Sequence, residues 1–346
     1  MDAFTNYLEK LGSNFLVSSM VPSLAFVVTS LLVFDPGLKI LSSFQQMDDI
    51  PRLIVLGLLV SMMTVILGFT LTALNTFILK MFEGYVIPAP IQFLYDKSRR
   101  IHRERAQSQR RHRDILEEKL RALKKIVKNN PAREPEFEEL KALHYKAAAN
   151  YGLVYPDDPN DIMPSRFGNT LKAAESYPGE RYGFDGVQFW PRLVHVIPTE
   201  YKLSIDGTRN ELSFLVNMSV LSILFSLSCV AAIFFSMWAV NGVGTNPGVF
   251  IDFLWVVFRF LALAALGFIS CIFFYNASIF SVGSFSLMIR SSFDLFRLDL
   301  LKKLGLKRPK DSIEEFDMWD NLNELVALGE HSVTYHNLEY REENEK

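Results

Sequence analysis

Apolar residues gather in four long runs along the chain. The longest lies between Arg259 and Arg290, where thirty consecutive residues include no Asp, Glu, Lys or Arg. As a helix this run rises roughly 45 Å, whereas the hydrocarbon core of a bilayer is about 30 Å thick. The other three runs are also long enough to span. We therefore predict an all-α integral membrane protein with four transmembrane helices, at residues 14–34, 53–79, 212–240 and 253–288.

Short connectors join the runs in pairs, which predicts two transmembrane hairpins. Of the 36 Lys and Arg residues, 23 lie between Lys80 and Arg209 and nine lie from Arg290 onward, whereas the connector 241–250 has none. Because positive residues are retained on the cytoplasmic side, both termini and the middle segment are predicted to be cytoplasmic. This topology fits a multi-pass protein of the plasma membrane or of a bacterial inner membrane.

Four segments follow from this pattern. We predict a transmembrane hairpin in residues 1–86, a mainly helical cytoplasmic domain in 87–200, a second transmembrane hairpin in 201–290 and cytoplasmic helices in 291–346. Past Arg290, apolar residues keep helical spacing as far as Gly305, so the fourth helix should continue beyond the membrane.

The polar pattern of the middle segment predicts a helical hairpin at 91–150 with an apolar seam from Leu116 to Val127. Residues 151–198 are rich in Pro, Gly and aromatic residues and are predicted to be loop-rich, with one short helix from a Ser165 cap to Tyr177. In the C-terminal segment, Ser312 and Glu315 have the spacing of a capping box. The helix that they open should dock on the hairpin through an aromatic face.

Composition agrees with a chain that is partly membrane and partly water-soluble. Hydrophobic residues make up 49% and charged residues 21%, and mean hydropathy is +0.16. Cys229 and Cys271 both lie in apolar runs, so we predict no disulfide framework. No phosphate-binding glycine loop, metal-binding histidine pair or nucleophile motif occurs. His195, Asp185 and Glu175 are close in the sequence, but sequence proximity alone does not make a catalytic triad. We expect neither an enzyme nor a bound cofactor or metal.

One face of the fourth helix carries small and polar residues. Within it, Arg259 is the residue of most interest, because a guanidinium inside a bilayer is costly unless it pairs, reaches the surface or faces water. In the structural interpretation, Arg259 extends outward to the membrane surface or pairs with Asp252. In the alternative, several copies surround an axis lined by this face, and Phe274 forms a constriction. The residues that would line such a pore are Asp252, Arg259, Ser270, Phe274, Ser281 and Ser284.

Arginines crowd the first half of the predicted hairpin, with Glu104 as the only acid between residues 97 and 113. Next to a cytoplasmic membrane face, such a cluster attracts anionic lipid headgroups. Nucleic acid is a poor candidate because no recognition fold accompanies the cluster. The cluster consists of Arg99, Arg100, Arg103, Arg105, Arg110, Arg111 and Arg113.

Two functions remain open at this point. The first is a homo-oligomeric, anion-favouring channel or pore-like protein with a cytoplasmic regulatory domain, suggested by the polar stripe. The second is a non-conducting membrane scaffold or sensor subunit that recruits a cytosolic protein through its helical hairpin. Helix packing in lipid explains the small-residue stripes without a pore. Self-association is expected in the first function, and a cytosolic partner in the second.

Overall fold

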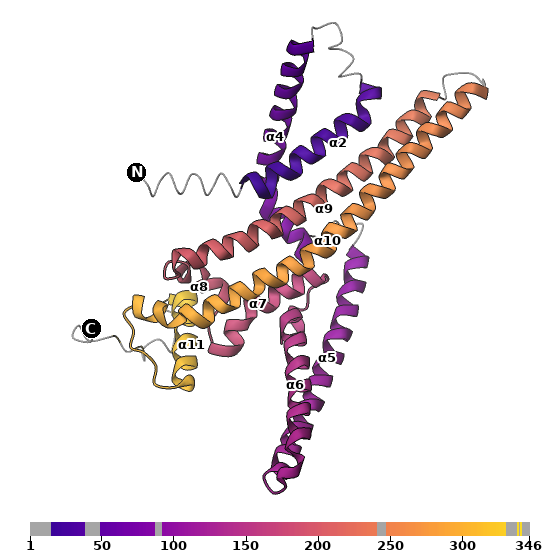
Figure 1. The fold of residues 1–346 in the computed structure, drawn as a ribbon. Coiled ribbons are helices and arrows are strands. Elements are labelled where there is room, and N and C mark those ends of the chain that lie inside the picture. Colours follow the sequence, from indigo (N-terminus) through magenta and orange to yellow (C-terminus); the bar gives the residue numbers. More distant parts are fainter. Residues whose placement is uncertain are drawn as a thin grey trace. The chain divides into compact units, whose positions relative to one another are not determined.

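A computed structural model describes residues 15–38, 49–86, 92–240 and 247–329, together with residues 338 and 340. These residues are almost entirely helical, and among them the only β-pairing is a bridge between Leu306 and Tyr340 (Figure 1). The chain divides into two compact units. One contains Met1–Leu79 and Asp206–Ser281, and the other contains Lys80–Ile205 and Val282–Lys346.

Four of the described helices are long and apolar enough to cross a membrane. This confirms four long apolar helices at the predicted positions and is compatible with a multi-pass membrane protein. The membrane type, the side on which the termini lie and the pairing into two hairpins remain predictions. The four helices are α2 (Val21–Leu38, which follows a π-helical turn, η1, at Leu16–Met20), α4 (Asp49–Glu83), α9 (Thr199–Val240) and α10 (Pro247–Lys303).

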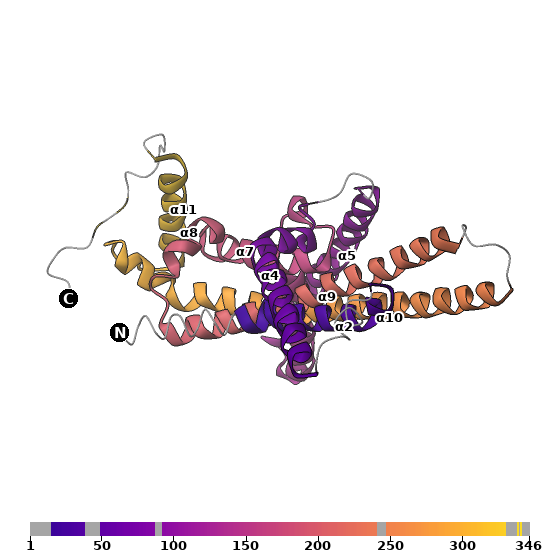
Figure 2. The same cartoon turned by 90° about the horizontal axis from the view of Figure 1, so that it is seen from above.

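Within the first unit, most large apolar side chains point outward. Phe280 is 78% exposed and Phe235 is 71% exposed, values that a water-soluble domain would not tolerate over so many residues. The outward side chains suit lipid contact. α9 and α10 run side by side in both views (Figures 1 and 2). Gly267 allows this approach, because a Cβ there would lie 3.1 Å from the Ser222 carbonyl oxygen and 3.2 Å from the Ser226 side chain.

The second unit contains the predicted helical hairpin. It consists of α5 (Gln92–Val127) and α6 (Glu134–Val154), which lie side by side (Figure 1). A 3₁₀ turn, η3 (Pro131–Arg133), joins them, and the Asn130 side chain accepts a hydrogen bond from the Ala132 N–H. The structure thus has two helices joined by a short turn in this segment, and α6 ends four residues later than predicted.

The prediction that residues 151–198 are loop-rich is wrong. They form a 3₁₀ turn, η4 (Pro159–Asp161), and two helices, α7 (Arg166–Tyr182) and α8 (Gly186–Leu193). Ser165 caps α7 as predicted, accepting from the Gly168 N–H at 2.8 Å. However, α7 continues through Pro178 and ends at Gly183, whose φ of 72° lies in the left-handed region. Glycine adopts this conformation without steric cost, so the helix stops there and not at Tyr177.

α10 continues without a break to Lys303, as predicted, and Gly305 follows with a φ of 78°. The next helix, α11 (Ser312–Leu328), is capped by Asp311 and not by Ser312. The Asp311 carboxylate accepts hydrogen bonds from the N–H groups of Ile313 and Glu314, both at 2.9 Å.

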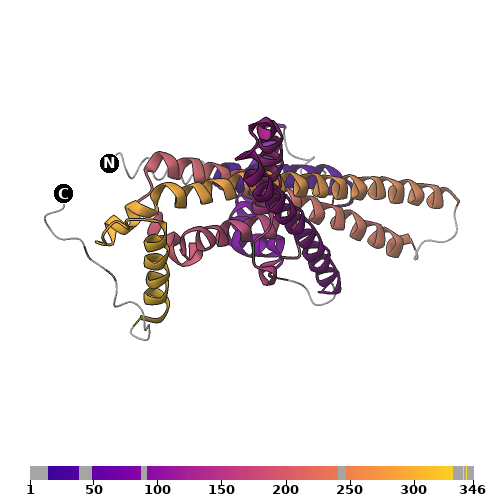
Figure 3. The same ribbon diagram turned by 90° about the horizontal axis from the view of Figure 1, so that it is seen from below.

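The predicted docking of α11 on the hairpin is also wrong. Its Trp319 is fully buried among Phe184, at 4.1 Å between ring centroids, and Phe189, at 5.7 Å. Phe293 of α10 belongs to the same core cluster. α11 therefore packs against α7, α8 and the last turns of α10 (Figures 1 and 3).

Candidate functional site

The predicted pore residues whose side chains the structure describes in the first unit have different surroundings. Arg259 is exposed and donates from Nη2 to the Val33 carbonyl oxygen at 2.8 Å, with its guanidinium 5.6 Å from the Phe260 ring. A backbone carbonyl of α2 is thus a partner of Arg259 that the sequence analysis did not predict. The Asp252 side chain lies outside the described residues, so the predicted pair is untested.

Ser270 lines an open groove of about 280 Å³ between α2, α9 and α10. The rest of this lining is almost entirely apolar and includes Phe26, Phe225 and Leu266. Phe274 is half-buried and lies against Phe273, at 5.3 Å between ring centroids. A groove with this lining suits a hydrocarbon chain better than an ion.

The last two residues of the predicted stripe differ in burial. Ser281 is 3% exposed, and its hydroxyl has no hydrogen-bond partner among the described residues. Ser284, which belongs to the second unit, is exposed. These two hydroxyls therefore lie in different environments, and the stripe as a whole does not form a single polar lining.

Other polar side chains of the first unit hold its helices together. Ser219 donates to the Cys271 carbonyl oxygen at 3.1 Å, and Ser226 donates to the Ala264 carbonyl oxygen at 2.8 Å. Asn217 reaches the Ser18 carbonyl oxygen at 2.8 Å. These bonds join α9 to α10 and to η1, and they favour the packing interpretation of the small-residue stripes.

The basic cluster of α5 divides into inward and outward side chains. Arg110 donates to the Asp157 carbonyl oxygen at 3.0 Å, and Arg113 lies 3.4 Å from the Asp157 carboxylate and over the Tyr151 ring. Arg99 is half-buried. Four members of the cluster are exposed, and their binding to anionic headgroups stays a prediction; these are Arg100, Arg103, Arg105 and Arg111.

A cluster of ionisable groups that the sequence analysis missed lies on α7. Lys172 is 3.8 Å from both Asp161 and Glu175. Glu83, at the end of α4, is within electrostatic reach of Glu175. Burial raises the pKa of Glu175; the positive charge of Lys172 opposes this shift, and the carboxylates of Asp161 and Asp185 add to it. Half-buried carboxylates with raised pKa values are typical of functional sites.

The chain is held closely around this cluster. Gly84 has a φ of 95°, and the Ser165 hydroxyl donates to the Phe82 carbonyl oxygen at 2.6 Å. A Cβ at Gly168 would lie only 2.2 Å from the Glu83 carbonyl oxygen. The turn after α4 therefore rests directly on the backbone of α7.

Next to this cluster, an open groove of about 500 Å³ carries strong negative charge. Among the described residues that line it, Lys172 is the only cation. Asp185 and Glu175 line this groove, whereas His195 is exposed and does not line it. The structure therefore does not bring these three residues together as a triad. In the described part of the chain, no group of three or more His, Cys, Asp or Glu is arranged to hold a metal ion. The acidic residues of the lining are Asp157, Asp158, Asp161, Glu175, Glu180, Asp185 and Asp320.

The last turns of α10 carry a second polar network. Asp294 accepts hydrogen bonds from the hydroxyls of Tyr177, at 3.0 Å, and Tyr182, at 2.7 Å. Burial, together with these bonds to a carboxylate, raises the pKa of both tyrosines. Arg297 lies 4.0 Å from the centroid of the Tyr182 ring and forms an ion pair with Glu315 at 2.7 Å.

Arg290 lies one turn earlier and is only 8% exposed. It donates to the Gly152 carbonyl oxygen at 2.6 Å and lies over the Tyr177 ring. Three charged residues of α10 are thus fixed by contacts from α6, α7 and α11.

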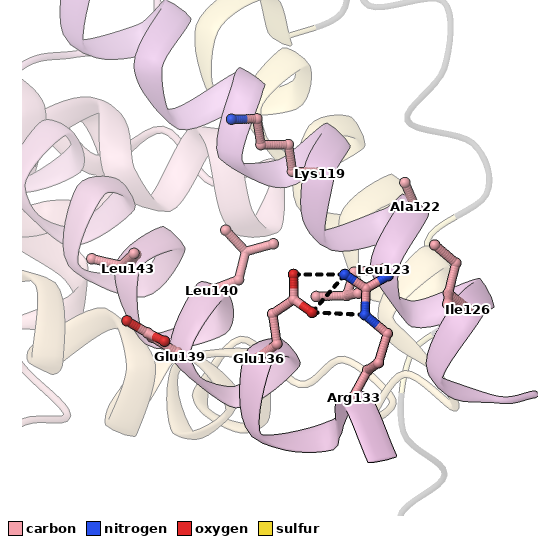
Figure 4. Close-up of a pocket in the computed structure, with 9 residues that line it drawn as sticks. All are labelled: Lys119, Ala122, Leu123, Ile126, Arg133, Glu136, Glu139, Leu140 and Leu143. Atoms are coloured by element: carbon pink, nitrogen blue, oxygen red, sulfur yellow. Dashed lines mark hydrogen bonds and ion pairs between the residues drawn. The ribbon is translucent and has the colours of Figure 1, made fainter. Parts of the chain in front are cut away.

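At the free end of the α5–α6 hairpin, the two helices leave an open groove of about 410 Å³ (Figure 4). An ion pair between Arg133 and Glu136, at 2.7 Å, lies at its tip. Lys119 and Glu139 lie on opposite sides of the groove (Figure 4). We call this surface the hairpin groove; it is lined by Lys119, Ala122, Leu123, Ile126, Arg133, Glu136, Glu139, Leu140 and Leu143.

Comparison with known proteins gives no relative for this chain: no family model, no curated protein and no solved structure matches it.

Proposed function

We propose that this protein is a non-conducting membrane scaffold or sensor subunit that uses its helical hairpin as an interaction arm. The observation that carries the proposal is the hairpin groove. Leu123 is buried between the two helices, but Ile126 remains 44% exposed and Leu143 remains 50% exposed beside it. These apolar side chains lie together along one groove, and grouped exposed apolar residues are typical of surfaces that another protein covers.

The hydrogen bonds of the polar side chains in the first unit support this proposal. Hydroxyls on α9 bond to backbone carbonyls of α10, so they are used for helix packing and are not free to solvate an ion. Arg259 is bonded to a backbone carbonyl of α2. A compact bundle accounts for these contacts without a water-filled path.

One observation favours the channel as a second candidate. The buried Ser281 hydroxyl has no partner among the described residues, and a buried polar group of this kind is costly unless water or a neighbouring molecule satisfies it. In a ring of several copies, this hydroxyl could face a hydrated axis. Arg259 would then attract anions to one end of that axis.

Anion flux decides between the two functions. The full chain is reconstituted into liposomes, and chloride efflux is compared with that of empty liposomes and of liposomes containing the Arg259→Leu variant. We expect the wild-type chain to give the background rate. Efflux above background that Arg259→Leu removes would establish the channel and refute the scaffold.

A further inference from the structure

The hairpin groove presents opposite charges on its two sides. From Lys119 to its end at Val127, α5 carries four cations and no acid, and Lys128 follows directly. From Glu134 to Leu140, α6 carries four acids and no cation. Of these charges, Lys119 on α5 and Glu136 and Glu139 on α6 line the groove, so a cation faces it from one helix and two acids face it from the other.

From this pattern we propose that the occupant of the hairpin groove is the hairpin of a second copy of the chain. The inference rests on the proposed function, because it names the partner of the same interaction arm. A two-fold axis along the hairpin places α5 of each copy against α6 of the other, so that basic meets acidic twice. The apolar side chains of the two grooves then face one another as the core of a four-helix bundle.

Particular side chains support this arrangement over a foreign partner. Arg133 and Glu136 already pair within one copy, with both side chains about half exposed. Lys119 and Glu139 are exposed on opposite sides of the groove, and neither forms a hydrogen bond or ion pair with the described residues of its own copy. In the two-fold arrangement, Lys119 of one copy meets Glu139 of the other. A surface that complements itself needs no other protein to cover it.

Charge reversal tests the inference on the full chain in detergent or nanodiscs, with copy number read by native mass spectrometry. The Lys119→Glu variant and the Glu139→Lys variant should each lose dimer at least tenfold relative to the wild type, because like charges meet at both contacts. Mixed together, the two variants should recover dimers that contain one copy of each, because both contacts are again opposite in charge. Lys124→Glu is the matched control, since it makes the same change on the far side of α5 and should keep the wild-type copy number.

Several outcomes would overturn the inference: a monomeric wild type, single variants that dimerise as the wild type does, or a mixture with no more dimer than its components. Recovery on mixing also excludes a pairing of Lys119 and Glu139 within one copy, which mixing could not repair. The flux measurement stays separate. If the liposomes conduct chloride and the charge-reversal variants behave as expected, the scaffold is refuted and the paired hairpins are retained. If the liposomes do not conduct and the chain is monomeric, the scaffold is retained and the paired hairpins are refuted.

Discussion

Replacing Gly168 by alanine tests how closely the turn after α4 is held against α7. The added Cβ would lie 2.2 Å from the carbonyl oxygen of Glu83, 2.9 Å from its carbonyl carbon and 3.0 Å from its Cα. All three atoms are backbone, so no side chain can rotate away. Relief requires the Glu83 backbone to move by about 1 Å, and overpacking of this kind costs typically about 1–3 kcal/mol.

The displaced turn would also weaken the hydrogen bond from Ser165 to the Phe82 carbonyl oxygen. A typical hydrogen bond contributes about 1 kcal/mol. In the opposite direction, alanine inside a helix stabilises the folded state by about 1 kcal/mol relative to glycine. The two smaller terms roughly cancel, so we expect a net loss of about 2 kcal/mol. For a unit of this size that lowers the midpoint of unfolding by roughly 4–8 °C.

Gly179→Ala is the control, because it makes the same substitution in the same helix. Its nearest contact would be the Phe184 carbonyl oxygen at 3.7 Å, an ordinary van der Waals distance. Trp190 and Trp319, in the second unit, report unfolding by intrinsic fluorescence during heating in detergent. Gly168→Ala should unfold earlier than the wild type and Gly179→Ala no earlier. Equal midpoints for the two variants would refute the close contact between Glu83 and Gly168.

Two further predictions concern charged groups of the second unit. Glu315→Gln should lower the free energy of unfolding by about 3 kcal/mol, because it leaves the largely buried Arg297 without its carboxylate partner. The double variant with Arg297→Met should lose less than the sum of the two single variants, because both change the same ion pair. Chemical denaturation measures these losses, and strictly additive values would contradict the coupling. Glu175 has a pKa raised above its ordinary value by burial, so its contribution to stability is present at low pH and is lost as pH rises through the folded-state pKa. Glu175→Gln should therefore gain in melting temperature over the wild type as pH rises from 4 to 8, and a constant difference across that range would exclude the raised pKa.

The predictions that succeeded depend on local patterns. Thirty uncharged residues after Arg259 can form only a long apolar helix, and the same spacing carries α10 on to Lys303. Ser165 was recognisable as a cap because the side chain and the N–H that it accepts from are three residues apart. In each case the cause and the effect lie within a few turns of the chain, so the sequence contains both.

The predictions that failed depend on residues far apart in the sequence or on competing signals. Pro178 and Gly179 look like a helix end, but the left-handed residue that ends α7 is Gly183. Trp319 could have packed on any apolar face, and its choice of Phe184 and Phe189 is made only by tertiary structure. The cluster around Glu175 was missed because Glu83 lies some ninety residues earlier in the chain.

The C-terminal end of α10 is held by polar contacts from two other helices of the second unit. One continuous helix contains Arg259 in the first unit and Asp294 in the second. In the second unit, Asp294 is bonded to two tyrosine hydroxyls and Arg297 to Glu315 of α11. Breaking any one of these bonds should therefore loosen the packing of α7 or α11 against the C-terminal end of α10.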